Sequence, residues 1–345
     1  MRELKIGRND AGQRLDKFLT KAIKGLPQSL LYKYIRLKKI KLNGARAQQN
    51  VILCEGDTVQ LYIRDEFFDV PEKDEGALSR ITPKLSILYE DENIMLLNKR
   101  PGVLVHDDAE GGENTLIMHV QAYLCGKGEY DPGSEQSFAP ALCNRIDRNT
   151  GGMVIAAKDA AALRDMNEAI REDHLSKFYL CLVHGHVERE KATLHGYLRK
   201  DSARNTVEVR DKEFPGSKEI ITKYRVLGER REGKDTVSLL EVELVTGRTH
   251  QIRAHMAHIG HPLVGDGKYG VNRDDKRSGY KFQALYAYRL RFDLPEDAGS
   301  LNYLRGREFV IPPADVWFTK GFDLKGKGVP KWDAPPSKPY GGGGS

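Results

Sequence analysis

The sequence predicts an α+β fold, in which a mixed, mostly antiparallel sheet with flanking helices follows a small α/β domain. Short apolar strand patterns recur at residues 94–98, 152–157, 177–183, 237–245 and 284–292. Segments with helical spacing of apolar residues are fewer in this part of the chain. This mixture is typical of the α+β class, and a length of 345 residues allows two or three domains.

Residues 1–64 are expected to form the small domain, followed by an acidic linker at residues 65–84. Two helical patterns have inner apolar positions at Leu15, Phe18, Leu19, Ile23, Leu31, Tyr34 and Ile35. Asn43-Gly44 then predicts a two-residue hairpin turn, and the alternation from Val59 to Ile63 predicts a strand. The linker is rich in Asp and Glu, contains Pro and Gly, and has no apolar period.

Positive charge is concentrated in the small domain. Residues 1–64 hold 14 Lys and Arg against 5 Asp and Glu, a net charge of +9, whereas the rest of the chain carries −3. The outward positions of the second helix carry four basic residues that could lie against a phosphate backbone: Lys33, Arg36, Lys38 and Lys39. We therefore expect a polyanion partner, with a merely solvated lysine-rich surface as the alternative.

Residues 85–318 are expected to form the main domain. One helix begins after Asp159 as its N-cap, and another spans about 250–259. Residues 125–139 are rich in Gly, Ser, Pro and charge, which predicts a mobile loop. Residues 319–345 are expected to form a disordered tail, whose final Gly-Gly-Gly-Gly-Ser resembles a cloning linker.

Several classes of protein lack support in the sequence. No run of 18 apolar residues exists, so no membrane span is expected, and the first residues lack a secretory apolar core. The four cysteines are scattered without a C-x-x-C pair, which favours free thiols in a reducing cytoplasm. There is also no phosphate-binding loop motif of the kind that ATP hydrolysis needs.

The segment N-R-I-D-R-N-T-G-G at residues 144–152 is the first candidate site. It places Asp147 between Arg145 and Arg148, directly before a Gly-Gly turn and an apolar strand. Flanking arginines can hold a carboxylate ionised at the mouth of a buried strand, as active sites require. A structural ion pair at a turn is the alternative.

The segment T-G-R-T-H-Q-I-R-A-H at residues 246–255 is the second candidate site. Arg253 falls in the first turn of the predicted helix and neighbours the core position Ile252. Its stem is therefore expected to be buried, while its guanidinium reaches out to a carboxylate or a phosphate. Arg248 in the preceding turn is a further candidate, although a solvent-exposed arginine is the simpler interpretation there.

Histidines in and after this segment raise the question of a metal site. They are His250, His255, His258 and His261. No H-E-x-x-H motif is present, no acidic residue lies between the first and the last, and His255 and His258 are expected to face away from the core. We therefore expect no metal.

The segment K-F-Y-L-C-L-V-H-G at residues 177–185 is the third candidate. Its residues alternate as in a strand, so Tyr179 is expected on the face opposite Phe178. Taken alone, a strand tyrosine indicates packing more than chemistry.

The order and surroundings of these segments resemble the RluA-type pseudouridine synthases. The resemblance rests on I-L-Y-E-D-E-N-I-M-L-L-N-K-R-P-G-V-L-V-H at 87–106, the segments at 144–152 and 177–185, the long block at 246–270, and A-L-Y-A-Y-R-L-R-F at 284–292. It spans about residues 85–318, and the long block is very specific. Residues 12–64 resemble a small RNA-binding domain, named after a small-subunit ribosomal protein, that often precedes this catalytic domain.

The resemblance implies a role for each matching residue. Asp147 would be the essential aspartate, and Arg253 would pair with it. Tyr179 would stack on the target base and help to move its proton. Arg145 would lie near the gap left by the extruded nucleotide.

Two positions depart from the family pattern. Asn144 stands where the family usually has His, and Gly151 stands where it usually has Ser. Neither is the catalytic carboxylate, so activity is expected to survive, with base flipping or RNA context altered.

Together these observations predict an enzyme that isomerises specific uridines to pseudouridine in structured RNA, without a cofactor. The reaction breaks the N1–C1′ bond and joins C5 to C1′, and it needs a carboxylate as nucleophile at C1′ or as base at C2′. Large-subunit ribosomal RNA is the expected partner, transfer RNA the second, and a monomer is expected. A non-catalytic RNA-binding or ribosome assembly protein is the alternative, while a metal-dependent nuclease lacks its ligand cluster.

Overall fold

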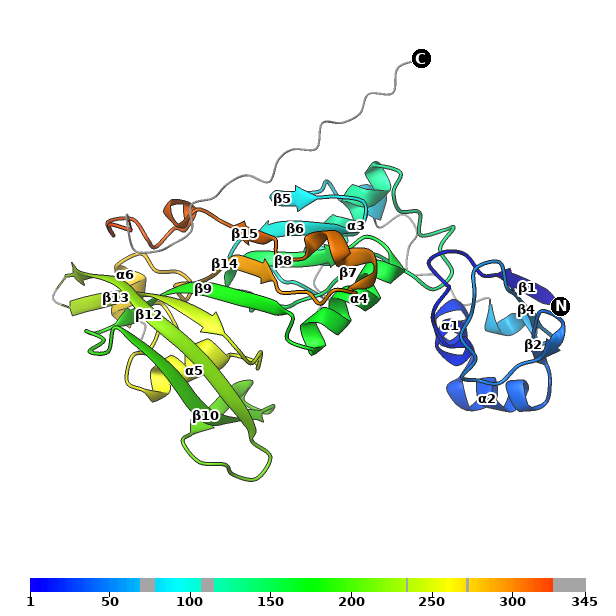
Figure 1. Ribbon diagram of the computed structural model, residues 1–345, viewed down its shortest axis with the longest axis horizontal. Coiled ribbons are helices and arrows are strands. Elements are labelled where there is room, and N and C mark those ends of the chain that lie inside the picture. Colours follow the sequence, from blue (N-terminus) through cyan, green and yellow to red (C-terminus); the bar gives the residue numbers. More distant parts are fainter. Residues whose placement is uncertain (69–77, 107–114, 234, 271–272, 325–345) are drawn as a thin grey trace, which may run out of the picture.

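The protein contains two separate sheets in its computed structural model, which describes residues 1–68, 78–106, 115–233, 235–270 and 273–324. A four-stranded sheet lies at the N-terminal end, and an eleven-stranded sheet runs through the main body (Figure 1). Of the strand pairs in the described residues, only β8 with β14 is parallel. The expected α+β class with a mostly antiparallel sheet is therefore confirmed.

The elements follow one another along the chain without long helices. The N-terminal part holds β1 (Arg2–Lys5), α1 (Leu15–Ala22), α2 (Gln28–Arg36), β2 (Ile40–Leu42), β3 (Ala45–Arg46), β4 (Thr58–Leu61) and the single turn η1 (Asp65–Phe67). The main body holds η2 (Leu78–Arg80), β5 (Ile87–Glu90), β6 (Ile94–Lys99), α3 (Leu116–Gly126), β7 (Ala141–Leu142), β8 (Gly151–Ala157), α4 (Ala160–Arg171), β9 (Leu175–His184), β10 (Lys191–Asp201), β11 (Thr206–Arg210), β12 (Lys218–Glu232), β13 (Asp235–Leu244), α5 (Gln251–His258), α6 (Arg273–Arg277), β14 (Leu285–Phe292), η3 (Gly299–Leu304), β15 (Glu308–Val310) and η4 (Pro313–Asp315).

Residues 1–68, called the N-terminal module below, pack α1 and α2 on a sheet of order β1-β4-β2-β3. Asn43 and Gly44 have left-handed φ of 51° and 77°, so the expected hairpin turn is confirmed. The apolar core extends past residue 64, because Phe67 is buried against Tyr34 with ring centroids 6.2 Å apart.

The basic surface of this module differs from the expectation. Lys33 and Arg36 lie on α2 and are exposed, but the helix ends at Arg36. Lys38 and Lys39 therefore follow the helix in a turn, where Lys38 adopts a left-handed φ of 59°. The prediction that all four share one helical face is wrong for these two residues.

The large sheet has the order β11-β10-β12-β13-β9-β14-β8-β6-β5, with β7 paired to β8 and β15 to β14. The five strands expected from apolar patterns correspond to β6, β8, β9, β13 and β14. The long strands β10 and β12 were not expected, since charged residues interrupt their apolar pattern.

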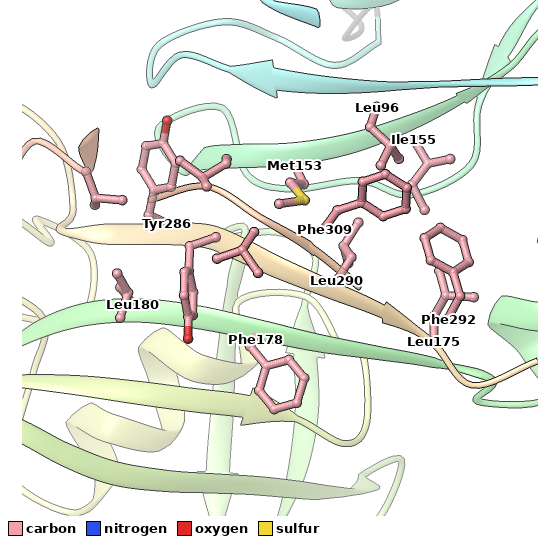
Figure 2. Close-up of a cluster of buried hydrophobic side chains, with 14 of the residues drawn as sticks. Leu96, Met153, Ile155, Leu175, Phe178, Leu180, Tyr286, Leu290, Phe292 and Phe309 are labelled. Carbon is pink, nitrogen blue, oxygen red and sulfur yellow. The ribbon is translucent and has the colours of Figure 1, made fainter. Parts of the chain in front are cut away.

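Two apolar clusters cover opposite faces of this sheet. One contains Phe178 and Leu180 of β9 together with Met166 of α4, and Figure 2 shows its packing around Ile155 and Phe309. The other contains Tyr179 and Cys181 of β9, with residues from α3 and α5. The alternation along β9 thus sends Tyr179 to the α5 face, as its position in the strand predicted.

The N-terminal module is hydrogen-bonded to the main body through residues 135–137. The Ser137 hydroxyl donates to Asp10 Oδ1 at 2.6 Å, and Gln136 Nε2 donates to Asp10 Oδ2 at 2.9 Å. Asn9 Nδ2 donates to Glu135 Oε1 at 2.6 Å. Part of the segment that we expected to be a mobile loop is therefore fastened to the module.

The folded body extends beyond the expected boundary at residue 318. Thr319 is only 3% exposed, and its hydroxyl donates to the carbonyl of Val316 at 2.9 Å. The rest of the expected tail, from residue 325, lies outside the described residues. In the part that the structure describes, no helix is long and apolar enough to cross a membrane.

Gly152 is expected to tolerate no side chain. Its φ is +112°, and a Cβ there would overlap the backbone of Ala287 on the parallel strand β14. Gly152→Ala should lower the free energy of unfolding by about 3 kcal/mol, because both the backbone conformation and the strand pairing are affected. Urea denaturation measures this, with Gly126→Ala at the end of α3 as the control, where the added methyl meets open space. Equal denaturation midpoints for the two variants would contradict the argument.

Candidate active site

A cavity of about 570 Å³ opens on the α5 face of the large sheet. Three segments that are far apart in the chain contribute most of its polar lining: the loop before β8, the strand β9, and the turn before α5 with the first turn of that helix. They bring together six of the residues singled out from the sequence, namely Asp147, Tyr179, Arg253, Arg145, Arg148 and Arg248. Of the described lining residues, Asp147 alone carries a carboxylate.

Asp147 sits at the mouth of β8, in a turn that its own backbone helps to close. The backbone N–H of Thr150 donates to the Asp147 carbonyl at 3.0 Å, and the completely buried strand β8 begins at the next residue. The carboxylate is 28% exposed and faces the cavity. Its Oδ2 accepts a hydrogen bond from Arg253 Nη1 at 2.7 Å, so the two lie in direct contact.

Arg253 divides its guanidinium between two carboxylates. Its Nε and Nη2 donate to Asp266 Oδ2 and Oδ1 at 2.7 and 2.9 Å, which makes a bidentate pair, while Nη1 remains for Asp147. The expected carboxylate partner of Arg253 is therefore present, but the residue is only 7% exposed, so its guanidinium is buried with its stem and does not reach outward. A buried guanidinium requires such partners, because its desolvation would otherwise be too costly.

The charges in this group stabilise one another. Burial would lower the pKa of Arg253, but the carboxylates of Asp266 and Asp147 raise it above its ordinary value. Burial would raise the pKa of Asp266, but Arg253 and the backbone N–H groups of Lys268 and Tyr269 hold it below its ordinary value. Arg253 is therefore a permanent cation, and Asp266 a permanent anion, at neutral pH.

His250 lines the cavity beside this group and contacts Tyr269. His250 has a left-handed φ of 54°, and its Nδ1 lies 2.8 Å from the Tyr269 hydroxyl. Its Nε2 lies 3.8 Å from Asp147 Oδ2. Burial lowers the pKa of His250 below its ordinary value, outweighing the attraction of Asp147, so the ring is neutral at pH 7.

The remaining histidines of this segment have separate partners. His255 is buried, with its Nδ1 3.0 Å from the Thr222 hydroxyl, so the expectation that it faces away from the core is wrong. The reason is that α5 is covered by β10 and β12 on its second side. His258 lies 2.8 Å from Asp211, and His261 contacts the carbonyl of His184. No group of three potential metal ligands occurs in the described residues.

Lys99 is hydrogen-bonded to the backbone of the loop that carries Asp147. It is 1% exposed, and its ammonium donates to the carbonyls of Val103 and Arg148 at 2.9 and 2.8 Å. Burial lowers the pKa of Lys99 to about 8, against the opposing attraction of Asp147. The lysine thus fixes the backbone on one side of Asp147 while adding positive charge near it.

Tyr179 forms part of the cavity wall. It is 7% exposed, and its hydroxyl has no hydrogen-bond partner among the described residues. Burial, followed by the charge of Asp147, raises the pKa of its hydroxyl, which therefore remains protonated at neutral pH. The ring is thus part of the wall that a planar ligand in the cavity would meet.

The other basic candidates occupy two separate places. Arg145, Arg148 and Arg248 are exposed around the cavity, and Arg148 Nε donates to the Gly102 carbonyl at 3.2 Å. The four basic residues of the N-terminal module do not line this cavity: Lys33, Arg36, Lys38 and Lys39. Of them, Arg36 lines a second hollow, where it is joined by two further arginines, Arg14 and Arg46.

The two departures from the family pattern have structural partners. The side chain of Asn144 pairs with β8, accepting from the backbone of Ile155 at 2.7 Å and donating to the Met153 carbonyl at 3.3 Å. A Cβ at Gly151 would overlap the ring of Tyr286, which donates from its hydroxyl to Asn98 at 2.6 Å. In this chain, therefore, Tyr286 occupies the space that a side chain at position 151 would need.

Several residues of the site were not identified from the sequence. They are Lys99, His250 as a neighbour of Asp147, Asp266 and Tyr269. Asp266 follows the apolar pair Leu263-Val264 and a glycine. An acid directly after an apolar segment is the sequence signal that could have identified it. Lys99 ends an apolar strand, and this is the only sequence signal of its burial.

Comparisons with known proteins agree on one family. Residues 93–258 match the family described as RNA pseudouridylate synthase. An uncharacterized RNA pseudouridine synthase of Mycoplasma genitalium is 34% identical over 83% of this chain and 88% of its own length. The ribosomal large subunit pseudouridine synthase C of Haemophilus ducreyi is 30% identical over 90% of this chain and 91% of its own length.

A solved structure shares the fold. The human RNA pseudouridylate synthase domain containing 1 superposes with a TM-score of 0.53 at 23% identity. The match covers 68% of this chain and 89% of that chain.

Asp266→Asn should destabilise the protein, because it leaves the buried guanidinium of Arg253 with a single anionic partner. Breaking one side of a buried ion pair typically lowers the free energy of unfolding by about 3 kcal/mol or more. Urea denaturation measures the change, and Asp274→Asn serves as the control, since that carboxylate is 85% exposed in its pair with Arg277. A surface pair of this kind contributes below about 1 kcal/mol. Equal losses in the two variants would show that Asp266 does not anchor Arg253.

Proposed function

The chain belongs to the family of RNA pseudouridine synthases, and we propose that Asp147 is the carboxylate with which it isomerises uridine. The observation that carries this proposal is that Asp147 is the sole carboxylate among the described lining residues of the cavity. It is also partly exposed, whereas Asp266, the other acid on Arg253, is fully buried. Only Asp147 can therefore meet a substrate.

The reaction requires an ionised carboxylate beside the ribose. The N1–C1′ bond breaks, the detached base turns, and C5 bonds to C1′, without an outside group. Asp147 serves either as nucleophile at C1′ or as base at C2′. In both cases Arg253 holds one oxygen of Asp147 through its hydrogen bond, leaving the other oxygen for the sugar.

We assign the base to Tyr179. Stacking on an aromatic ring contributes roughly 1–3 kcal/mol per base, which would hold the uracil while it is detached. The Tyr179 ring lines the same cavity as Asp147, and its protonated hydroxyl has no partner among the described residues. That hydroxyl is available to exchange a proton with the base as C5 loses its hydrogen.

The proposed substrate is large-subunit ribosomal RNA, with transfer RNA as the second possibility. The name of the Haemophilus ducreyi relative specifies the large ribosomal subunit. A base inside a helix cannot reach a cavity, so the nucleotide must flip out. Arg145, Arg148 and Arg248 are exposed around the opening, where they can neutralise phosphates of the flanking RNA, with Arg145 nearest to the gap in our assignment.

We further propose that the N-terminal module, expected at residues 1–64 and extended to Phe67 by its core, is an RNA-binding domain of the ribosomal-protein type. It precedes a catalytic domain that begins near residue 85 and extends past residue 318. The net charge of +9 and the exposure of Lys33, Arg36, Lys38 and Lys39 support this division. One chain suffices for the reaction, since a single copy supplies Asp147, Tyr179 and Arg253. We therefore propose a monomer.

Asp147→Asn tests the proposal most directly. Asparagine keeps the shape of the side chain but can neither attack C1′ nor remove the C2′ proton, so pseudouridine formation should fall below detection. RNA affinity should change less than about twofold, because phosphate contacts elsewhere supply most of it. The measurement is pseudouridine formed on unmodified large-subunit ribosomal RNA, beside a binding titration.

The outcomes separate three interpretations. Equal product from the parent and Asp147→Asn would remove Asp147 from the mechanism. No product from the parent on ribosomal or transfer RNA would favour a binding protein that keeps the fold. A parallel loss of affinity and product would point to misfolding, which a thermal melt distinguishes.

The N-terminal module should supply affinity and not chemistry. Each lost phosphate contact should reduce the slope of log affinity against log salt by about 0.7–0.9. Replacing Lys33, Arg36, Lys38 and Lys39 together with Gln in the full chain should therefore weaken binding and flatten this slope, while turnover at saturating enzyme persists. A matched variant with four Gln at exposed acidic positions of the main body controls for charge changes in general. An unchanged slope in the module variant would contradict an RNA-binding role.

A further inference from the structure

Lys177 is a basic residue that lines the cavity and has no role in the proposed mechanism. It lies on β9 two residues before Tyr179, so both side chains project from the same face of the strand. Both line the same cavity. The Lys177 ammonium lies beside the turn before α5, where a Cβ on Gly247 would be 3.9 Å from Nζ.

Lys177 differs from the other buried cations of the site in having no partner. Lys99 is satisfied by backbone carbonyls, and Arg253 by two carboxylates. For Lys177, half-buried as it is, the described residues provide neither a hydrogen bond nor an ion pair. Burial lowers the pKa of Lys177, and the charge of Asp173 opposes this shift. Keeping an unpaired ammonium there is costly unless a ligand supplies the missing charge.

The position of Lys177 indicates which part of a nucleotide it meets. The described ion pairs of Asp147 are with Arg253 and His250 and not with Lys177, whose ammonium lies beside Gly247 in the turn before α5. Two residues along a strand correspond to about 7 Å. The Lys177 ammonium therefore meets a part of the cavity wall that is separate from the contact between Asp147 and Arg253.

We propose that Lys177 binds a backbone phosphate that directly flanks the extruded uridine, and so positions the nucleotide in the cavity. The inference rests on the proposed function, in which the sugar meets Asp147 and the base meets Tyr179. A nucleotide held in that way carries phosphates on both sides of its sugar. A compact ammonium charge on a flexible stem suits a phosphate, and Arg248 is exposed at the same opening.

The test compares Lys177→Met with Lys177→Arg and with Lys223→Met. Methionine keeps most of the stem and removes the charge, and arginine restores the charge. Lys223 is the matched control, because it lies on β12 of the same sheet, is already paired with Glu243 at 3.3 Å, and does not line the cavity. The probe is unmodified large-subunit ribosomal RNA transcribed in vitro, with affinity measured over a range of salt concentrations and pseudouridine measured in parallel.

We expect Lys177→Met to weaken binding roughly 10-fold at low salt and to flatten the salt slope by about 0.7–0.9, as loss of one phosphate contact does. Lys177→Arg should keep the parent slope, and Lys223→Met should match the parent throughout. The melting temperature of Lys177→Met should equal or exceed that of the parent, because an unpaired buried charge is removed.

Other results overturn the assignment. Slower turnover with an unchanged salt slope would place Lys177 against the base, and a lowered melting temperature would make its role structural. An active parent combined with an unchanged slope in Lys177→Met would refute the phosphate site alone. A parent that forms no product while Lys177→Met still flattens the slope would refute the proposed function but retain the phosphate site. No product together with an unchanged slope would refute both.

Discussion

The geometry of the site depends on one guanidinium that two carboxylates share. Asp266 uses both oxygens on Arg253, and its Oδ1 also accepts from the backbone of Lys268 and Tyr269. The guanidinium therefore cannot rotate, and its remaining N–H group points at Asp147. Since α5 carries Arg253 while a separate loop carries Asp147, this contact also joins the two walls of the cavity. The buried acid, which never meets the substrate, thus determines where the exposed acid is held.

The opposite side of the Asp147 loop is held by backbone interactions. The Lys99 ammonium donates hydrogen bonds to the carbonyls of Val103 and Arg148, which lie on two different loops. The strand β8 begins immediately after the turn at Thr150. The parallel pairing of Gly151 and Gly152 with β14 brings two backbones together where no side chain fits between them. A loop residue is in this way held against the edge of a buried strand, which limits the orientations that the carboxylate can adopt.

The sequence was most informative where apolar periodicity is strong. It predicted β6, β8, β9, β13 and β14 and the two helices that cover them, but not β10 and β12, whose alternating charged residues conceal the strand period. Asp147, Tyr179 and Arg253 could be singled out because each lies in a distinctive local string. Asp266 could not, since an acid in a turn resembles any surface carboxylate until the fold brings it to an arginine 13 positions earlier. The turn at Lys38 could not be predicted either, because the residue with the left-handed backbone conformation is a lysine and not a glycine.

The hydrogen bonds between Asp10 and residues 136–137 have a consequence for how such proteins can be recombined. The segment that receives the N-terminal module runs on into β7 and then into the Asp147 turn, so module and active site are consecutive parts of one polypeptide path. A module without a carboxylate at the position of Asp10 would leave the Ser137 hydroxyl and the Gln136 amide without this acceptor. Exchange of the module alone would therefore have to preserve the acid of this junction, or exchange residues 136–137 with it.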